Sequence, residues 1–202
     1  MMTRKETILA AATKLFADRG FHETSTSEIA KLTGVSEGSI FYHFKNKEDL
    51  LLNILQQIKE RILEEFSIYK ADAQKVNGME QMLEVVSFYL YLAGKMEDDF
   101  ILLERRYLYQ LAQVNPICSQ YLQEIYECLM DFFEEPILKG RRDGSVGSMA
   151  SRKSALLILT MVDGLVRFRN CNLYNTAALH VELINACRRI LEPDFNPKTD
   201  SK

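Results

Sequence analysis

The 202-residue sequence has no long run of apolar residues. Its unbroken apolar segments are far shorter than the ~20 residues that a membrane-spanning helix needs. The first sixteen residues, MMTRKETILAAATKLF, mix charged residues into a helical pattern and lack the continuous apolar core of a signal peptide. The sequence therefore predicts no membrane contact, and we expect a cytoplasmic protein.

Metal-binding and redox motifs are also missing. The chain has four cysteines and three histidines, and no two cysteines form a Cys-x-x-Cys pair. A zinc site is therefore not expected, and thiols in such a sequence are usually reduced and packed in the core. We predict no metal and no cofactor. The cysteines are Cys118, Cys128, Cys171 and Cys187, and the histidines are His22, His43 and His180.

An excess of basic charge, which usually marks a nucleic-acid-binding protein, is absent as well. The formal net charge is −3, and residues 1–50 carry seven basic and seven acidic residues, so this segment is neutral. Any case for DNA binding must therefore rest on the geometry of the helices.

Helical periodicity is present along almost the whole chain, and no alternating apolar pattern predicts a strand. We expect an all-α protein with two domains. Residues 1–48 form a three-helix, helix-turn-helix DNA-binding domain, and residues 49–202 form a helical ligand-binding and dimerisation domain. A helix that starts at about residue 47 connects them. In the second domain, residues 79–93 are apolar almost all round, which predicts a helix buried on most sides. The helix that starts at Pro116 is expected to kink or end at Pro136, before a glycine-rich loop, KGRRDGSVGS. Two further helices are expected at about 149–171 and 176–191.

Two short helical segments near the N-terminus have closely spaced start and stop signals. Ser25 and Glu28 have the spacing of a capping box, and Gly34 provides the left-handed backbone of a tight turn. Ser36 then caps the next helix, in which Ile40 is expected to face the small Ala30. This spacing predicts a helix-turn-helix.

The second helix of such a motif places a few side chains in the major groove of DNA. Glu37, Ser39, Tyr42 and His43 are expected to point outward, while Gly38 permits close approach of the backbone. The helix starts at Ser25, Ser36 and Asn46 offer N–H groups to phosphates, and Lys47, in the first turn of its helix, is placed to contact a phosphate.

The segment ILAAATKLFADRGFHETSTSEIAKLTGVSEGSIFYHFKNKEDLL resembles the DNA-binding domain of the tetracycline-repressor (TetR) family of transcriptional regulators. The resemblance extends from about Thr7 to Leu52. It rests on Phe16, Gly20, Phe21, Ile29, Ala30, Gly34, Val35, Ser36, Gly38, Tyr42, His43, Phe44, Lys47 and Leu50. It implies an all-helical, homodimeric repressor that binds a palindromic double-stranded DNA operator and is released by a small molecule. By this resemblance, phosphates would be contacted by Ser25, Thr26, Tyr42, His43 and Lys47, and base edges by Glu37, Gly38 and Ser39.

One position departs from the family pattern. Phe41 stands where the family usually has tyrosine, whose hydroxyl often meets the DNA backbone. Phe41 either lies at the DNA interface without donating a hydrogen bond or packs in the core, in which case Tyr42 carries the role alone. For His43, a structural role and a phosphate contact both remain open.

The segment beyond residue 52 contains eight of the nine tyrosines. Although each one alone is more typical of a core, together they suit a pocket for an apolar or aromatic effector. We expect this cavity to be lined by Phe66, Tyr89, Tyr107, Tyr126 and Phe168. Arg105 and Arg106 are expected mainly as solvated charges near Glu104, with a contact from one of them to an anionic ligand as the alternative.

The last two long helices carry more apolar surface than one bundle needs, which indicates a homodimer interface resembling that of the family. Two other classes of protein remain open. One is an interaction module whose helix-turn-helix binds protein or bends DNA without sequence choice. The other is an all-helical enzyme, but no phosphate loop, metal-ligand motif or Ser/His/Asp set supports catalysis.

Overall fold

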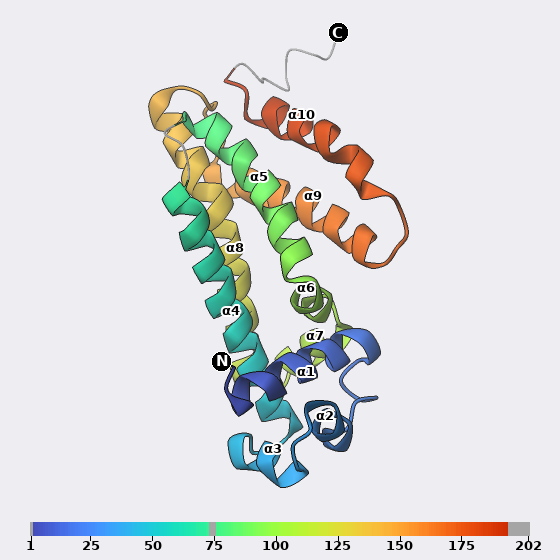
Figure 1. The fold of residues 1–202 in the computed structure, drawn as a ribbon. Coiled ribbons are helices and arrows are strands. Elements are labelled where there is room, and N and C mark those ends of the chain that lie inside the picture. Colours follow the sequence, from blue (N-terminus) through green and yellow to red (C-terminus); the bar gives the residue numbers. More distant parts are fainter. Residues whose placement is uncertain (1, 73–75, 194–202) are drawn as a thin grey trace. The chain divides into compact units, whose positions relative to one another are not determined.

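The computed structural model describes residues 2–72 and 76–193 (Figure 1). Over these ranges it contains α-helices and one 3-10 helix, and no strand, which confirms the all-α prediction. None of the helices in these ranges is both long and apolar enough to cross a membrane. The helices are α1 (Arg4–Arg19), α2 (Thr26–Thr33), α3 (Glu37–His43), α4 (Lys47–Asp72), α5 (Gly78–Lys95), α6 (Glu97–Leu103), α7 (Arg106–Ala112), α8 (Pro116–Asp143), α9 (Ser151–Asn170), η1 (Thr176–Leu179) and α10 (His180–Leu191).

The chain forms two compact units. Unit 1 consists of Met1–Leu63 and Met96–Ile125, and unit 2 of Glu64–Lys95 and Tyr126–Lys202. Two of the three boundaries fall inside the long helices α4 and α8, and the third lies between α5 and α6. The predicted boundary at residues 48/49 separates a DNA-binding domain from a ligand-binding domain by their functions. The two units are instead defined by contacts within each of them, so the predicted boundary stays a prediction.

Unit 1 is built around α1, which packs against α2 and α6. The inward face of α1 includes Ile8, Ala12 and Phe16, all fully buried. Burial of a large apolar side chain contributes about 1.5–3 kcal/mol, so this face holds the helix in place. The helix begins with a capping box in which Thr3 and Glu6 satisfy each other's backbone N–H groups, a signal that the sequence analysis missed.

Unit 2 is built around α5, which packs against α9 and α10. As predicted, α5 is buried on most sides, from Met79 through Tyr89 to Ala93. Its start lies directly against α8, because a Cβ added to Gly78 would come 2.0 Å from the backbone nitrogen of Gly140. The two backbones touch here, and only glycine at residue 78 allows this approach.

Of the two outcomes predicted at Pro136, an end of the helix is wrong, because α8 continues to Asp143, and a kink stays a prediction. Proline removes a single N–H from the helix ladder, and tertiary contacts hold the turns beyond it. Ile137 is fully buried, and the Lys139 ammonium donates to the carbonyl of Val76 at 2.6 Å. The expected glycine-rich loop is therefore shorter, since its first five residues are helical. The chain turns at Gly144, where φ is 79°.

Candidate nucleic-acid interface

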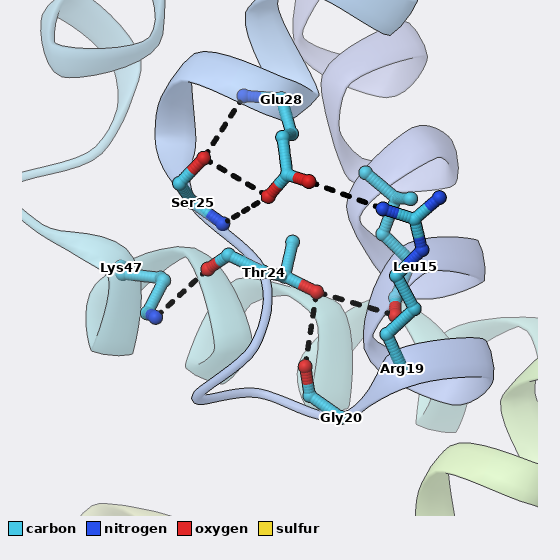
Figure 2. A network of polar contacts seen from close by, with 7 residues as sticks. All are labelled: Leu15, Arg19, Gly20, Thr24, Ser25, Glu28 and Lys47. Atoms are coloured by element: carbon cyan, nitrogen blue, oxygen red, sulfur yellow. Dashed lines mark hydrogen bonds and ion pairs between the residues drawn. The ribbon is translucent and has the colours of Figure 1, made fainter.

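The start of α2 is fixed by a reciprocal capping box (Figure 2). The Glu28 backbone N–H donates to the Ser25 hydroxyl at 3.2 Å, and the Ser25 N–H donates to the Glu28 carboxylate at 2.9 Å. Arg19, in the last turn of α1, forms an ion pair with Glu28 at 3.1 Å. These contacts lower the pKa of Glu28 below its usual value, mainly through the Ser25 N–H. The predicted capping box is confirmed, and it also joins α2 to α1.

The turn between α2 and α3 has the predicted geometry. Gly34 adopts the left-handed conformation, with φ 69° and ψ 18°, and its N–H donates to the carbonyl of Ala30. Ala30 and Ile40 are both buried, as expected for two helices that cross closely. The hydroxyl of Ser36 accepts from the Ser39 N–H at 3.2 Å and caps α3. The two helices therefore form a helix-turn-helix.

One face of α3 is open to solvent. Tyr42 is 85% exposed and Phe41 is 51% exposed, so Phe41 is not a core residue. Phe44 is buried, and His43 is half-buried with its ring edge-on to Tyr42. Phe41 and Tyr42 therefore give this short helix an exposed apolar surface that carries a single hydroxyl group.

The N-terminal ends of α2 and α3 are tied together. The hydroxyl of Thr26 donates to the carboxylate of Glu37 at 3.0 Å. Ser25, Glu37 and Gly38 are exposed, and Thr26 and Ser39 are half-buried. The residues predicted for phosphates and for base edges thus lie at the starts of two linked helices. Because Glu37 accepts from Thr26, its carboxylate is already oriented.

The start of α4 provides a third helix end. Asn46 caps it, since its side-chain oxygen accepts from the Asp49 N–H at 2.8 Å, as predicted. The Lys45 N–H donates to the Asp49 carboxylate at 2.8 Å, which fixes the link between α3 and α4. Lys45, an exposed residue directly before Asn46, supplies positive charge near the start of α4, and Lys31 is an exposed lysine in the last turn of α2.

Lys47 is engaged within the protein. Its ammonium donates to the carbonyls of Phe21 and Thr24 at 2.8 and 2.9 Å, and it lies 4.4 Å from the centre of the Phe21 ring. The Thr24 hydroxyl donates in turn to the Gly20 carbonyl at 2.9 Å (Figure 2). Burial lowers the pKa of Lys47 below its usual value, and Glu23 partly opposes this shift. Lys47 therefore holds the segment between α1 and α2.

A family model for bacterial regulatory proteins of the tetR family matches residues 8–54, the segment from α1 into α4. This N-terminal segment is therefore similar to the DNA-binding segment of TetR-family regulators. The helix-turn-helix described above lies within the matched residues, and the match supports a DNA-binding regulator of transcription.

Known TetR-family proteins resemble different parts of the chain. The fatty acid metabolism regulator protein of Bacillus subtilis is 26% identical over 139 residues, which is 69% of each chain. QacR of Staphylococcus aureus is 48% identical over 54 residues, which is 27% of this chain and 29% of QacR. The structure of FadR from Bacillus subtilis in complex with stearoyl-CoA has a TM-score of 0.69 and 24% identity, and the match covers 92% of this chain and 98% of that one. This last similarity shows the fold.

The predicted effector residues of this chain do not all lie in one unit. Tyr107 belongs to unit 1, where its ring is stacked on Phe21 at 4.2 Å between centroids. Tyr89 is buried in unit 2 and donates its hydroxyl to Asp163 at 2.6 Å. Phe168 is 43% exposed.

The other two predicted effector residues, Phe66 and Tyr126, are half-buried in unit 2. Phe66 stacks on Phe132, with centroids 3.5 Å apart. It also lies in a cluster with Tyr69 and Phe88, whose rings are stacked at 4.4 Å. Burial raises the pKa of Tyr69 to about 12, and its buried hydroxyl has no hydrogen-bond partner among the described residues. The effector assignment stays a prediction for all five residues.

The expected solvation of Arg105 is wrong. One of its terminal nitrogens donates to the carbonyl of Ala17 and to that of Asp18 at 3.2 Å, at the C-terminal end of α1. A cation is favourable there because it meets the negative end of the helix dipole. Since α1 and Arg105 are far apart in sequence, periodicity gives no signal for this contact.

Proposed function

We propose that this chain is a homodimeric repressor of the TetR family whose α3 docks in the major groove of a palindromic operator. The exposed face of α3, with Tyr42 85% exposed, supports this proposal most directly. A large aromatic side chain gains more from a partner surface than from water, and its hydroxyl can reach a phosphate. Exposed basic side chains are few here, so we expect the helix ends to contribute much of the phosphate binding.

We assign four roles to the residues of this interface. Glu37, Gly38 and Ser39 face base edges, and Phe41 packs against the DNA backbone without donating. Ser25, Thr26, Ser36, Tyr42 and His43 serve as the phosphate-facing residues. Lys47 acts by holding the segment between α1 and α2 in place, because both of its strong hydrogen bonds are made inside the protein.

The operator test is a gel-shift titration with DNA from upstream of the gene itself. The variant Tyr42→Ala should weaken binding about tenfold, because it removes one phosphate contact and an apolar contact. The control is Tyr91→Ala, which removes another exposed tyrosine, from α5 in unit 2. Equal binding to unrelated DNA would favour an architectural module, and unchanged binding by Tyr42→Ala would reject α3 as the recognition helix.

We infer a hydrophobic effector from the aromatic side chains of unit 2. The stacked rings of Phe66, Tyr69, Phe88 and Phe132 form an apolar region that includes the unpartnered hydroxyl of Tyr69. The similarity to a fatty acid metabolism regulator supports an effector with a long apolar part. Release of the operator by fatty acids or their thioesters, compared with small polar metabolites, tests this inference in the same gel shift.

The proposed dimer uses α9 and α10. The structure buries much of their apolar pattern inside unit 2, including Leu159, Val162 and Cys187. Other apolar side chains remain exposed, with Leu156 at 52%, Leu157 at 53% and Val181 at 64%. Light scattering of the wild type should give the mass of a dimer, and Leu157→Glu should give that of a monomer.

A further inference from the structure

Unit 1 contains a cavity of about 330 Å³ between the segment that follows α1 and the helices α6 and α7. This volume is at the lower end of the range found for small-molecule sites. The inner wall is apolar and buried, formed by Phe21, Leu51, Leu102 and Leu108. The rim is charged and exposed. The cavity is therefore apolar inside and polar at its mouth.

The rim is rich in guanidinium groups. Arg19, Arg105 and Arg106 all line the cavity, and they are used differently. Arg19 is paired with Glu28, and Arg105 donates to the end of α1. Arg106 is exposed and has no hydrogen bond or ion pair within the described part of the chain.

The charge balance at this cavity is positive. The Nε atom of Arg105 is buried and has no hydrogen-bond partner among the described residues. Because this nitrogen is closed to solvent, the guanidinium group available to a ligand is the exposed one of Arg106. Glu23 is the one carboxylate among the described lining residues, and its charge is offset by the nearby Lys47. The charges at the cavity therefore favour an anion.

The walls are rigid because aromatic rings pack against one another. Phe21 and Tyr107 are stacked with an interplanar angle of 7°, and His22 lies edge-on to both. Such a wall loses little conformational entropy when a flat ligand packs beside it. The cavity is thus suited to a ring on its inner side and to a negative charge at its mouth.

We propose that this cavity binds a small aromatic anion, a single ring that carries a carboxylate or phosphate group. The ring lies against Leu102 and Leu108, and the anionic group meets the guanidinium of Arg106. This site lies entirely in unit 1, and it is additional to the hydrophobic effector proposed for unit 2. A ligand here contacts both the segment after α1 and α7, so it stabilises unit 1.

The test is isothermal titration calorimetry of the full chain with phenyl phosphate. Inorganic phosphate and phenol are titrated separately as controls, because the first has the negative charge without the ring and the second has the ring without the charge. Phenyl phosphate should bind one site per chain, at least tenfold more tightly than either. Arg106→Gln should weaken its binding about tenfold through loss of a charged hydrogen bond. The matched control Arg167→Gln, which removes an exposed guanidinium from α9 in unit 2, should leave the affinity unchanged.

Unchanged affinity in Arg106→Gln would overturn the proposal, as would inorganic phosphate binding as tightly as phenyl phosphate. A second readout needs no variant. Nuclear Overhauser contacts from the probe ring to the methyl groups of Leu102 or Leu108 are expected, and contacts confined to unit 2 would overturn the proposal. Because these measurements contain no DNA, their outcome is separate from that of the operator test.

Discussion

Replacing Lys47 by methionine removes an ammonium group that holds two backbone carbonyls. Methionine keeps most of the side-chain length and can still pack over Phe21, so the change isolates the charge. The hydrogen bonds to Phe21 and Thr24 are short, at 2.8 and 2.9 Å. A hydrogen bond to a charged group contributes about 1.5–3 kcal/mol when it is buried, and less where water can replace the donor.

Lys47 is only partly buried, and water can reach both carbonyls once the ammonium is gone. We therefore expect Lys47→Met to lower the free energy of unfolding by about 2 kcal/mol. For a chain of this size, that corresponds to a fall in Tm of roughly 4–8 °C. Urea and thermal unfolding, followed by circular dichroism at 222 nm, measure both quantities. Lys45→Met is the matched control, because the Lys45 side chain is exposed and only its backbone N–H is engaged.

The same variant separates the two roles considered for Lys47. A lysine that contacts a phosphate contributes about one unit to the slope of log K against log salt concentration, whereas a lysine that positions a loop contributes none. We expect Lys47→Met to weaken operator binding with the salt slope unchanged. A slope reduced by about one unit, with stability equal to that of the wild type, would refute our reasoning and restore the direct phosphate contact.

Three further predictions concern the backbone and a buried charge. Gly34→Ala should destabilise the protein by about 1–2 kcal/mol, because φ is 69° there, a conformation that is unfavourable for alanine. No atom lies within 4 Å of the added Cβ, so a clash adds nothing to this cost, and urea unfolding measures it. Gly78→Ala should cost about 1–3 kcal/mol or more, since its Cβ would meet the backbone of Gly140, and preserved stability would show that α5 and α8 separate easily. Burial raises the pKa of Asp99 to about 6 despite its ion pair with Arg61 at 2.6 Å. The folded protein therefore holds this proton more tightly than the unfolded chain, and the Asp99 contribution lowers the free energy of unfolding by up to about 3 kcal/mol as pH rises from about 4 to 7. Asp99→Asn should remove this part of the pH dependence in urea titrations, and an unchanged pH profile would contradict the assignment.

Local signals made the helix-turn-helix predictable from the sequence. The caps at Ser25, Ser36 and Asn46 and the left-handed turn at Gly34 depend on residues only a few positions apart. Such contacts are specified by spacing, which a sequence shows directly. The same reasoning predicted the buried α5 and the start of α8 at Pro116.

Contacts between distant residues were not predictable in this way. The sequence places Tyr107 among many tyrosines, and only the fold shows that its ring lies on Phe21. The continuation of α8 past Pro136 depends on contacts with α5 that outweigh the lost hydrogen bond. The inward hydrogen bonds of Lys47 likewise need the carbonyls of a segment more than twenty residues away.

The hydrogen bonds from Arg105 to the C-terminal end of α1 have a consequence for protein engineering. In a chimera, residues 1–48 would be replaced by the DNA-binding domain of another regulator. The Arg105 guanidinium would then face the end of a different helix, and Tyr107 would lose its contact with Phe21. Transplanting Met96–Ile125 together with the N-terminal segment keeps both contacts intact. For biosensor construction from this protein, the exchangeable part is therefore discontinuous in sequence.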